Sequence, residues 1–349
     1  MRILLALSLF GCNIKQGGSK SLSEPGGEPA QEPSASPTSE PTSSPTNEPN
    51  SQPSSEPSSS PTSEPASSPT NEPNSQPSNE PVELLDYTQA GPYIVTSVTK
   101  TAFVTNCDYG MEYVEFVPQG VSNPTLMVLG HGFLRSGKMV GWAEHYASWG
   151  IHVLAPTLCH YNVFLGVDHE MNGQNMMELA AQYGASSVIY GGQSAGGLAA
   201  IIAASQDQHA IGVLGMDATD TEGVPSVPDF IGQNYAGNVS VPGFAIVGEP
   251  SSCNSNNNGI TLFEMMSTAQ VLRVSSSDHC DYENPTDWGC ETFCLNSTTN
   301  FDDSEIAPVI AQLSTAAVLA LSGDTEAQAA WTNENLAEWI TSGLVSRLR

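Results

Sequence analysis

Beyond residue 82 the chain alternates between short apolar runs and longer segments whose apolar residues recur at helical spacing. The first two runs, 93–105 and 112–118, alternate apolar and polar residues as antiparallel strands do. The later runs are apolar on both faces, which is typical of parallel strands covered by helices on both sides. These later runs are TLMVLG (125–130), IHVLAP (151–156), SVIYGG (187–192), AIGVLGMD (210–217), GFAIVG (243–248) and AQVLRVSS (269–276).

Segments with helical periodicity lie between and after these runs. They predict helices over 138–150, 172–184, 195–205, 306–321 and 331–348. Strands that alternate with helices predict an α/β domain with a mostly parallel central sheet flanked by helices. The most apolar helix, 306–321, is too short for a membrane span, so we expect it to pack against the sheet.

The first 82 residues carry no such periodicity. Proline occupies every fourth position from Pro25 to Pro81, and SSPTNEPNSQPS occurs at both 43–54 and 67–78. A segment with so little apolar surface cannot offset its ordering entropy, so we expect a disordered tether rich in Pro, Ser and Glu. At this proline density the tether should favour extended polyproline II, which rises about 3.1 Å per residue.

The extreme N-terminus, MRILLALSLFGC, has one basic residue, a short apolar run and then Gly11-Cys12. It resembles a bacterial lipoprotein signal, in which the cysteine becomes the lipidated first residue; an ordinary signal peptide is the alternative. The predicted organisation is therefore a signal peptide (1–11), a disordered linker (12–82) and one folded domain (83–349). We expect an extracytoplasmic protein, exposed on the cell surface or in the periplasm and held to the membrane only by a lipid on Cys12, or alternatively secreted.

The net charge of the chain limits the classes of molecule that it can bind. The 349 residues include 37 acidic and 9 basic side chains, for a formal net charge of −28. A chain this acidic repels phosphate backbones at long range, so we expect no nucleic-acid partner. We also expect a monomer.

The segment GGQSAGG (191–197) contains a G-x-S-x-G motif centred on Ser194. The motif follows the predicted strand 187–192 directly and opens the predicted helix 195–205. That context is typical of a nucleophile elbow, a sharp strand-to-helix turn that lifts a serine hydroxyl above the edge of a sheet. The sequence therefore predicts Ser194 as a nucleophile.

A serine nucleophile needs a general base, and seven histidines compete for that role. His279 lies just beyond the last predicted strand, 269–276, and is the one that gives the chain order serine, acid, histidine. We therefore expect His279 to be the base. The other six are His131, His145, His152, His160, His169 and His209.

Three carboxylates can orient that base. Asp217 ends the strand 210–217 at the sheet edge where ligands of open α/β sheets bind, and it is the first choice. Glu249 ends the next strand, and Asp220 lies three residues beyond Asp217. Both stay open as alternatives.

The last component that such a catalytic site needs is a pair of hydrogen-bond donors for the oxyanion that forms during the reaction. GHGF (130–133) directly follows the strand 125–130, where lipases and esterases carry an HG-type motif. We expect one backbone N–H from Phe133 and a second from Ala195, the residue after the nucleophile. This chemistry requires no metal ion and no organic cofactor.

Four segments together resemble the chlorophyllase, platelet-activating-factor acetylhydrolase and polyester hydrolase (cutinase-like) group of the α/β-hydrolase superfamily. They are GHGF (130–133), GGQSAGG (191–197), LGMD (214–217) and SSDHCDY (276–282), and the resemblance spans roughly residues 90–325. It implies an α/β-hydrolase catalytic domain over 83–349. The first two relatives place the acid as Asp217 is placed here, whereas polyester hydrolases use the next strand, which matches Glu249. Gln193 departs from the histidine of many relatives, at a position that takes no part in proton transfer.

Six cysteines remain besides Cys12, an even number that predicts up to three disulfides in an exported protein. Zinc is a weaker interpretation because no C-x-x-C pair is present. Some polyester hydrolases link the loop after the acid-bearing strand to a cysteine beside the catalytic histidine. The resemblance therefore implies the pairs Cys253–Cys280, Cys290–Cys294 and Cys107–Cys159.

Taken together, these residues predict an exported serine hydrolase that cleaves small-molecule or polymeric carboxylic esters through an acyl-enzyme. Two alternatives use the same sequence features. The triad also serves amidases and peptidases, and a catalytically silent surface-binding lipoprotein could retain the fold.

Overall fold

The computed structural model describes residues 85–349 except 134, 163–165, 222–229 and 295–299. The predicted signal peptide (1–11), the lipidation candidate Cys12 and the linker (12–82) lie outside the described residues.

The centre of the described fold is a nine-stranded sheet with the order β1-β2-β4-β3-β7-β8-β9-β10-β11. The six strands from β4 to β10 in that order run parallel, while β1, β2 and β11 pair antiparallel at the two sides. The mostly parallel sheet flanked by helices is thereby confirmed. The strands are β1 (Val95–Ala102), β2 (Met111–Pro118), β3 (Leu126–Gly130), β4 (His152–Pro156), β7 (Val188–Gln193), β8 (Ala210–Met216), β9 (Gly243–Val247), β10 (Ala269–Val274) and β11 (Val345–Arg347), with a separate pair β5 (Tyr161–Asn162) and β6 (Gly166–Val167).

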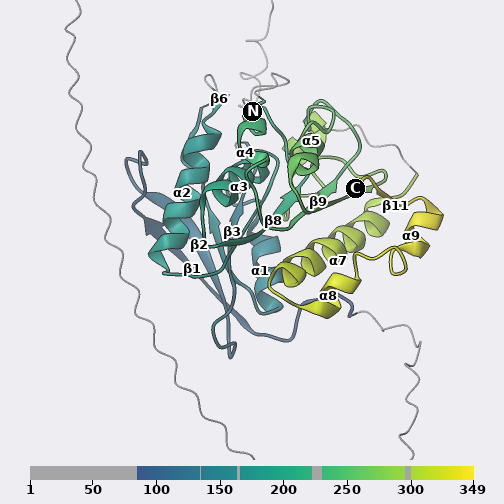
Figure 1. Cartoon of the computed structure of the whole chain (residues 1–349), viewed down its shortest axis with the longest axis horizontal. Helices are drawn as coiled ribbons and strands as arrows, with labels where there is room; N and C mark the ends of the chain where they lie inside the picture. Colours follow the sequence, from purple (N-terminus) through teal and green to yellow (C-terminus); the bar gives the residue numbers. More distant parts are fainter. Residues whose placement is uncertain (1–84, 134, 163–165, 222–229, 295–299) are drawn as a thin grey trace, which may run out of the picture. The chain divides into compact units, whose positions relative to one another are not determined.

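Helices cover both faces of this sheet (Figure 1). On one face α2 and α3 pack against the central strands and α5 against β9 and β10, whereas α1 and α7 cover the other face. The helices are α1 (Val140–Ser148), α2 (His169–Gln182), α3 (Ala195–Gln206), α4 (Gln233–Ala236), α5 (Gly259–Met265), α6 (Trp288–Cys294), α7 (Asp303–Leu321), α8 (Thr325–Ala329) and α9 (Ala337–Ser342).

The strand sequences explain the two layers, because successive side chains of a strand point to opposite faces. In β3, Met127 and Leu129 join the core beneath α1 and α7. Their neighbours Leu126 and Val128 join the core beneath α2 and α3. A run that is apolar at every position is therefore buried on both sides, as the sequence predicts.

Helix α7 is the longest of the described helices and begins at a capping box formed by Asp302 and Glu305. By length and composition it is the one described helix that is apolar enough to cross a membrane. In the structure, however, 78% of its apolar window is buried. Its apolar face packs on β8, β9 and β10, so α7 is a core helix, as expected for 306–321.

The prediction of one helix over 331–348 is wrong. The structure has a short helix, α9, and then the edge strand β11. Gly343 ends α9 in a left-handed conformation with φ 82°. The following apolar residues then pair with β10, where Leu272 faces Arg347 and Val274 faces Val345. Gly343 therefore ends the helix. The residues after it form a strand because the edge of β10 is otherwise unpaired, although their apolar spacing is helical.

Parallel register brings the carboxyl ends of the central strands to one edge. Gly130 of β3 pairs with Gly192 of β7, and Gln193 of β7 pairs with Met216 of β8. The segments that follow β3, β7, β8, β9 and β10 therefore leave the sheet at the same edge. They hold the predicted nucleophile, the base, the oxyanion donors and all three candidate acids.

Candidate active site

Ser194 lies at the turn between β7 and α3 with φ 54° and ψ −122°. A positive φ is rare for a residue with a side chain and marks a strained position. The turn is possible because glycines surround it: a Cβ on Gly196 would lie 2.4 Å from the Gly130 carbonyl, and a Cβ on Gly192 would lie 2.4 Å from the Gly196 backbone. The structure therefore places Ser194 on the sharp strand-to-helix turn that the motif predicts.

His279 and Asp217 meet beside this turn. The Nδ1 atom of His279 lies 2.6 Å from Oδ2 of Asp217, and both side chains are buried. A carboxylate only accepts hydrogen bonds, so Nδ1 carries the proton and Nε2 keeps a free lone pair. This is the tautomer that a general base toward a serine hydroxyl requires.

The other two candidate acids point elsewhere. The carboxylate of Glu249 accepts the backbone N–H of Ser276 at 3.2 Å. Asp220 is buried, and its carboxylate accepts the backbone N–H of Gly232 at 3.2 Å. Among the three, Asp217 is the one that the structure brings to His279.

Asn254 is a site residue that the sequence did not reveal. Its fully buried amide donates to Oδ2 of Asp217 at 3.1 Å, and the backbone N–H of Gly248 donates to Oδ1 at 3.1 Å. The Asn254 carbonyl oxygen in turn accepts the backbone N–H of Ser251 at 2.8 Å. Donors on both carboxylate oxygens fix the orientation of Asp217.

His131 belongs to the GHGF segment and stabilises it through hydrogen bonds of its ring. Its Nε2 accepts the backbone N–H of Leu158 at 2.9 Å, so Nδ1 carries the proton and donates to the Gly132 carbonyl at 2.6 Å. Burial lowers the pKa of His131 to about 4, against the opposing effect of the Gly132 hydrogen bond. His131 is thus a neutral support of the loop that leads to Phe133.

The two predicted oxyanion donors are the backbone N–H groups of Phe133 and Ala195, which come from two different segments near Ser194. Phe133 follows Gly132, whose Cα faces the Ser194 side chain: a Cβ built there would lie 3.1 Å from Ser194 Cβ. Ala195 opens α3 and directs its N–H out of the helix start. Neither N–H, and no atom of the Ser194 hydroxyl, has a hydrogen-bond partner among the residues that the structure describes.

Gln193 contributes a contact that the sequence interpretation did not assign. Its side-chain nitrogen lies 3.2 Å from His279 Nε2 and 3.2 Å from the His279 carbonyl oxygen. The side chain is 1% exposed. The position before the nucleophile therefore touches the reactive nitrogen of the predicted base.

The disulfide pattern corrects two predicted pairs. Cys107–Cys159 is present, but the pairs Cys253–Cys280 and Cys290–Cys294 are wrong. The structure instead has Cys253–Cys294 and Cys280–Cys290, with Cα–Cα distances of 5.6 and 5.8 Å. The two cysteines of α6 are four residues apart on one helix, where Cβ atoms lie about 5–6 Å apart and a disulfide needs roughly 3.5–4.5 Å.

The corrected pairs tie α6 to both sides of the candidate site. One bond joins it to Cys280, next to His279, and the other to Cys253, next to Asn254. The sulfur atoms of Cys280, Cys290 and Cys294 form the one cluster of metal-ligand type in the described part of the chain, and all three are disulfide-bonded. The cross-links hold the base loop and the support of the acid in place.

Charged groups connect the base loop to the GHGF side of the site. Arg135 binds both carboxylate oxygens of Glu283 at 2.5 and 2.6 Å, and it also contacts Asp287 at 3.0 Å. The Glu283 carboxylate is almost fully buried. Two residues beyond His279, burial raises the pKa of Asp281 to about 7, with nearby carboxylates acting in the same direction. The acidic loop is therefore partly neutralised near neutral pH.

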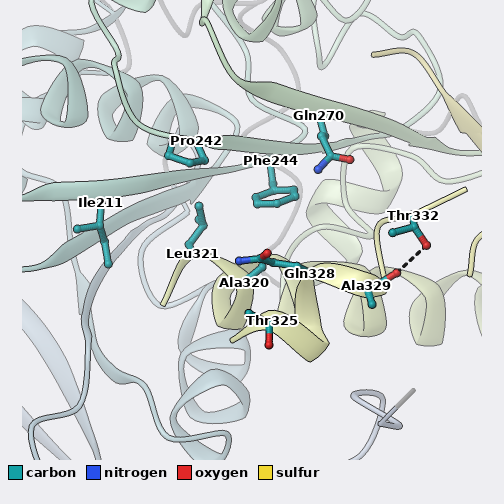
Figure 2. A pocket seen from close by; sticks show the side chains of 10 residues that line it. All are labelled: Ile211, Pro242, Phe244, Gln270, Ala320, Leu321, Thr325, Gln328, Ala329 and Thr332. Atoms are coloured by element: carbon teal, nitrogen blue, oxygen red, sulfur yellow. Dashed lines mark hydrogen bonds between the residues drawn. The ribbon is translucent and has the colours of Figure 1, made fainter. Parts of the chain in front are cut away.

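A cavity of about 530 Å³ lies away from these residues. Figure 2 shows its lining, which includes Phe244, Gln270, Leu321 and Ala329. Phe244 and Gln270 are second residues of β9 and β10, so the cavity lies at the amino ends of the strands. It contains none of the predicted site residues.

Comparison with protein-family models and with curated proteins found no match to this chain.

Proposed function

We propose that this protein is a serine hydrolase of the α/β-hydrolase superfamily that cleaves carboxylic esters through an acyl-enzyme. One observation carries the proposal: the Nδ1 atom of His279 lies 2.6 Å from the buried carboxylate of Asp217, beside a strained turn that presents Ser194. The parallel sheet supports it, because all three residues follow carboxyl ends of parallel strands, where such sites form.

The reaction begins when Ser194 Oγ attacks the carbonyl carbon of the ester. The hydroxyl proton passes to Nε2 of His279, and the carbonyl electron pair moves to the oxygen. When the tetrahedral intermediate collapses, the bond to the alkoxy group breaks and His279 gives its proton to that leaving group. Water then attacks the acyl-enzyme by the same route, which releases the acid and restores Ser194.

Two further groups have roles in this scheme. The backbone N–H groups of Phe133 and Ala195 stabilise the developing oxyanion, and each such donor contributes about 3–4 kcal/mol to catalysis in related sites. Asp217 stabilises the imidazolium that forms on His279, and the amide of Asn254 holds the Asp217 carboxylate in place. No step in this scheme calls for a metal ion or an organic cofactor.

An extracytoplasmic location agrees with the three disulfides, which persist in oxidising compartments. We propose that the chain is exported and that Cys12 carries a lipid anchor at the end of the proline-rich tether. The substrate is then an ester that the folded domain meets outside the cytoplasm, either a small molecule or a polymer.

The test compares the native chain with Ser194→Ala on p-nitrophenyl esters and with a fluorophosphonate probe. The matched control is Ser205→Ala, because Ser205 lies on α3, the helix that follows Ser194, and its hydroxyl donates to the Ile202 carbonyl. We expect probe labelling and turnover in the native chain and the control, and loss of both in Ser194→Ala. Full turnover in Ser194→Ala, or no labelling of the native chain, would contradict the proposal. An amide matched to the best ester decides between an esterase and an amidase.

A further inference from the structure

The side chain of Gln193 lies between the two loops that flank Ser194. On one side its amide nitrogen contacts the His279 ring and the His279 carbonyl oxygen, each at 3.2 Å. On the other side its carbonyl oxygen faces Gly132, where a Cβ would lie only 2.2 Å away. Gln193 thus fills the space between the GHGF loop and the base loop, and Gly132 leaves room for it.

The orientation of the amide follows from its partners. The His279 backbone carbonyl only accepts hydrogen bonds, so the NH₂ end of Gln193 must face it. The two hydrogens of that NH₂ group serve both acceptors, the carbonyl oxygen and the Nε2 lone pair. Gln193 therefore donates two hydrogen bonds to the same residue.

This arrangement leaves the other end of the amide without a partner. Gln193 Oε1 is buried and accepts no hydrogen bond from any residue that the structure describes. A buried acceptor without a partner costs about 1–3 kcal/mol, and such groups in native structures call for an explanation. Here the unpaired oxygen is the consequence of directing both donors at His279.

We propose that Gln193 is a positioning residue that holds the ring of His279 in its reactive orientation; this inference rests on the proposed serine hydrolase function. Asp217 accepts from Nδ1, and Gln193 donates to Nε2. Both contacts favour the ring with its proton on Nδ1, and together they hold the ring from opposite sides. The base is therefore set before substrate arrives.

The contact also has to be released during the reaction. When substrate binds, the Ser194 hydroxyl donates to Nε2 and takes over that lone pair, while the amide keeps its hydrogen bond to the His279 carbonyl. This exchanges one hydrogen bond for another. The loop position is maintained while the ring changes partner.

Gln193→Met tests the idea, because methionine keeps the length of the side chain and removes the amide. The matched control is Gln312→Met: Gln312 is also buried and also binds backbone groups, those of Tyr87 and Leu85, but it lies on α7. The main readout is the ¹⁵N spectrum of the imidazoles, which distinguishes protonated from unprotonated ring nitrogens. Asp217 keeps the proton of His279 on Nδ1 in all three proteins. In Gln193→Met the signal of the unprotonated Nε2 should move away from its position in the native protein and the control, because Nε2 loses the hydrogen bond from the amide.

Kinetics provide the second readout. We expect kcat of Gln193→Met on p-nitrophenyl esters to fall by about 10- to 100-fold with little change in KM, since a slightly misplaced base slows chemistry more than binding. A purely structural role would lower stability in both glutamine variants and leave the signal of His279 Nε2 unchanged.

Gln193→Glu is the second variant and retains the volume of the side chain. It replaces two donors by a carboxylate next to Nε2, which favours the protonated ring, so the acidic limb of the pH–rate profile should move to higher pH. The charged groups around the base loop stay the same in every variant: Asp217, Glu249, Asp278, Asp281, Glu283, Arg135 and Asp303.

The outcomes separate the two proposals. An unchanged Nε2 signal in Gln193→Met, or an unmoved acidic limb in Gln193→Glu, overturns the role of Gln193. Absence of ester turnover in the native chain contradicts the proposed function, and the imidazole spectra still decide whether Gln193 holds the ring.

Discussion

The two edges of the central sheet differ in what they offer a ligand. The amino edge has the cavity of about 530 Å³, within the size range of small-molecule sites, lined by apolar, amide and hydroxyl side chains (Figure 2). The carboxyl edge instead gathers a strained serine, a paired histidine and aspartate, and several acidic groups. The described cavity therefore lies at one edge and the candidate site at the other.

The described cavity therefore does not mark the position of the candidate site. Parallel strands carry their carboxyl ends to one edge, so loops that leave that edge can bring together residues far apart in sequence. Ser194 and His279 are 85 positions apart in the chain, and Asp217 reaches His279 across 62. At the amino edge the cavity lining contains no ionisable side chain.

The largest expected effect comes from the acid at the carboxyl edge. Asp217→Asn keeps the shape of the side chain but no longer requires the proton on Nδ1 of His279, so we expect kcat to fall by about 10⁴-fold. Steady-state kinetics on a p-nitrophenyl ester measure the loss. The fold should remain intact, as checked by circular dichroism.

Glu249→Gln is the matched control for that variant, because Glu249 was the alternative acid and its carboxylate binds the backbone of Ser276. We expect turnover close to that of the native chain. A strong loss in Glu249→Gln together with normal turnover in Asp217→Asn would reverse the assignment of the acid.

The central part of the fold could be predicted from the sequence, because strands that are buried on both faces are apolar at nearly every position. Six runs that are apolar at nearly every position correspond to the parallel strands β3, β4, β7, β8, β9 and β10. The C-terminal segment was misjudged, since Gly343 and the open edge of β10 act through tertiary pairing. The spacing of apolar residues within one segment gives no information on an unpaired strand edge elsewhere in the fold.

Within the candidate site, chain order and local motif were enough to pick out Ser194, His279 and Asp217, which the structure brings to one edge. The contacts of Gln193 and Asn254 were not foreseen, because they depend on side chains meeting across loops. The cysteine pairs failed for a similar reason. The resemblance suggested Cys290–Cys294, but those residues turned out to share the helix α6.

The second expected effect is a pH dependence of the free energy of unfolding, which comes from His131 at the carboxyl edge of the sheet. His131 is buried and neutral, with its pKa lowered to about 4, while an unfolded histidine titrates near 6.5. Between these values the unfolded chain binds a proton that the folded chain does not, so stability falls as pH decreases from about 7 to 4. The shift corresponds to a loss of about 3 kcal/mol.

Urea unfolding at several pH values measures this loss as the difference between the native chain and His131→Gln. Asp281 has the opposite sign, since its raised pKa makes the folded state more stable as pH falls through about 7, and it cancels in the difference. The control is His209→Gln, on a histidine whose side chain is 48% exposed. Parallel curves for the native chain and His131→Gln would show that His131 does not titrate as inferred.

The smallest effect is expected at the amino edge. Ala329→Phe places a ring into the cavity, next to Phe244 and Leu321. Because the cavity has room for the ring and lies at the opposite ends of the strands, we expect kcat and KM to stay at their native values and stability to change by no more than about 0.5 kcal/mol. A tenfold loss of ester turnover in a folded Ala329→Phe variant would contradict the separation of the two edges. It would mean that the cavity influences the carboxyl edge through the strands that connect them, β8, β9 and β10, and the cavity would then belong to the functional part of the molecule.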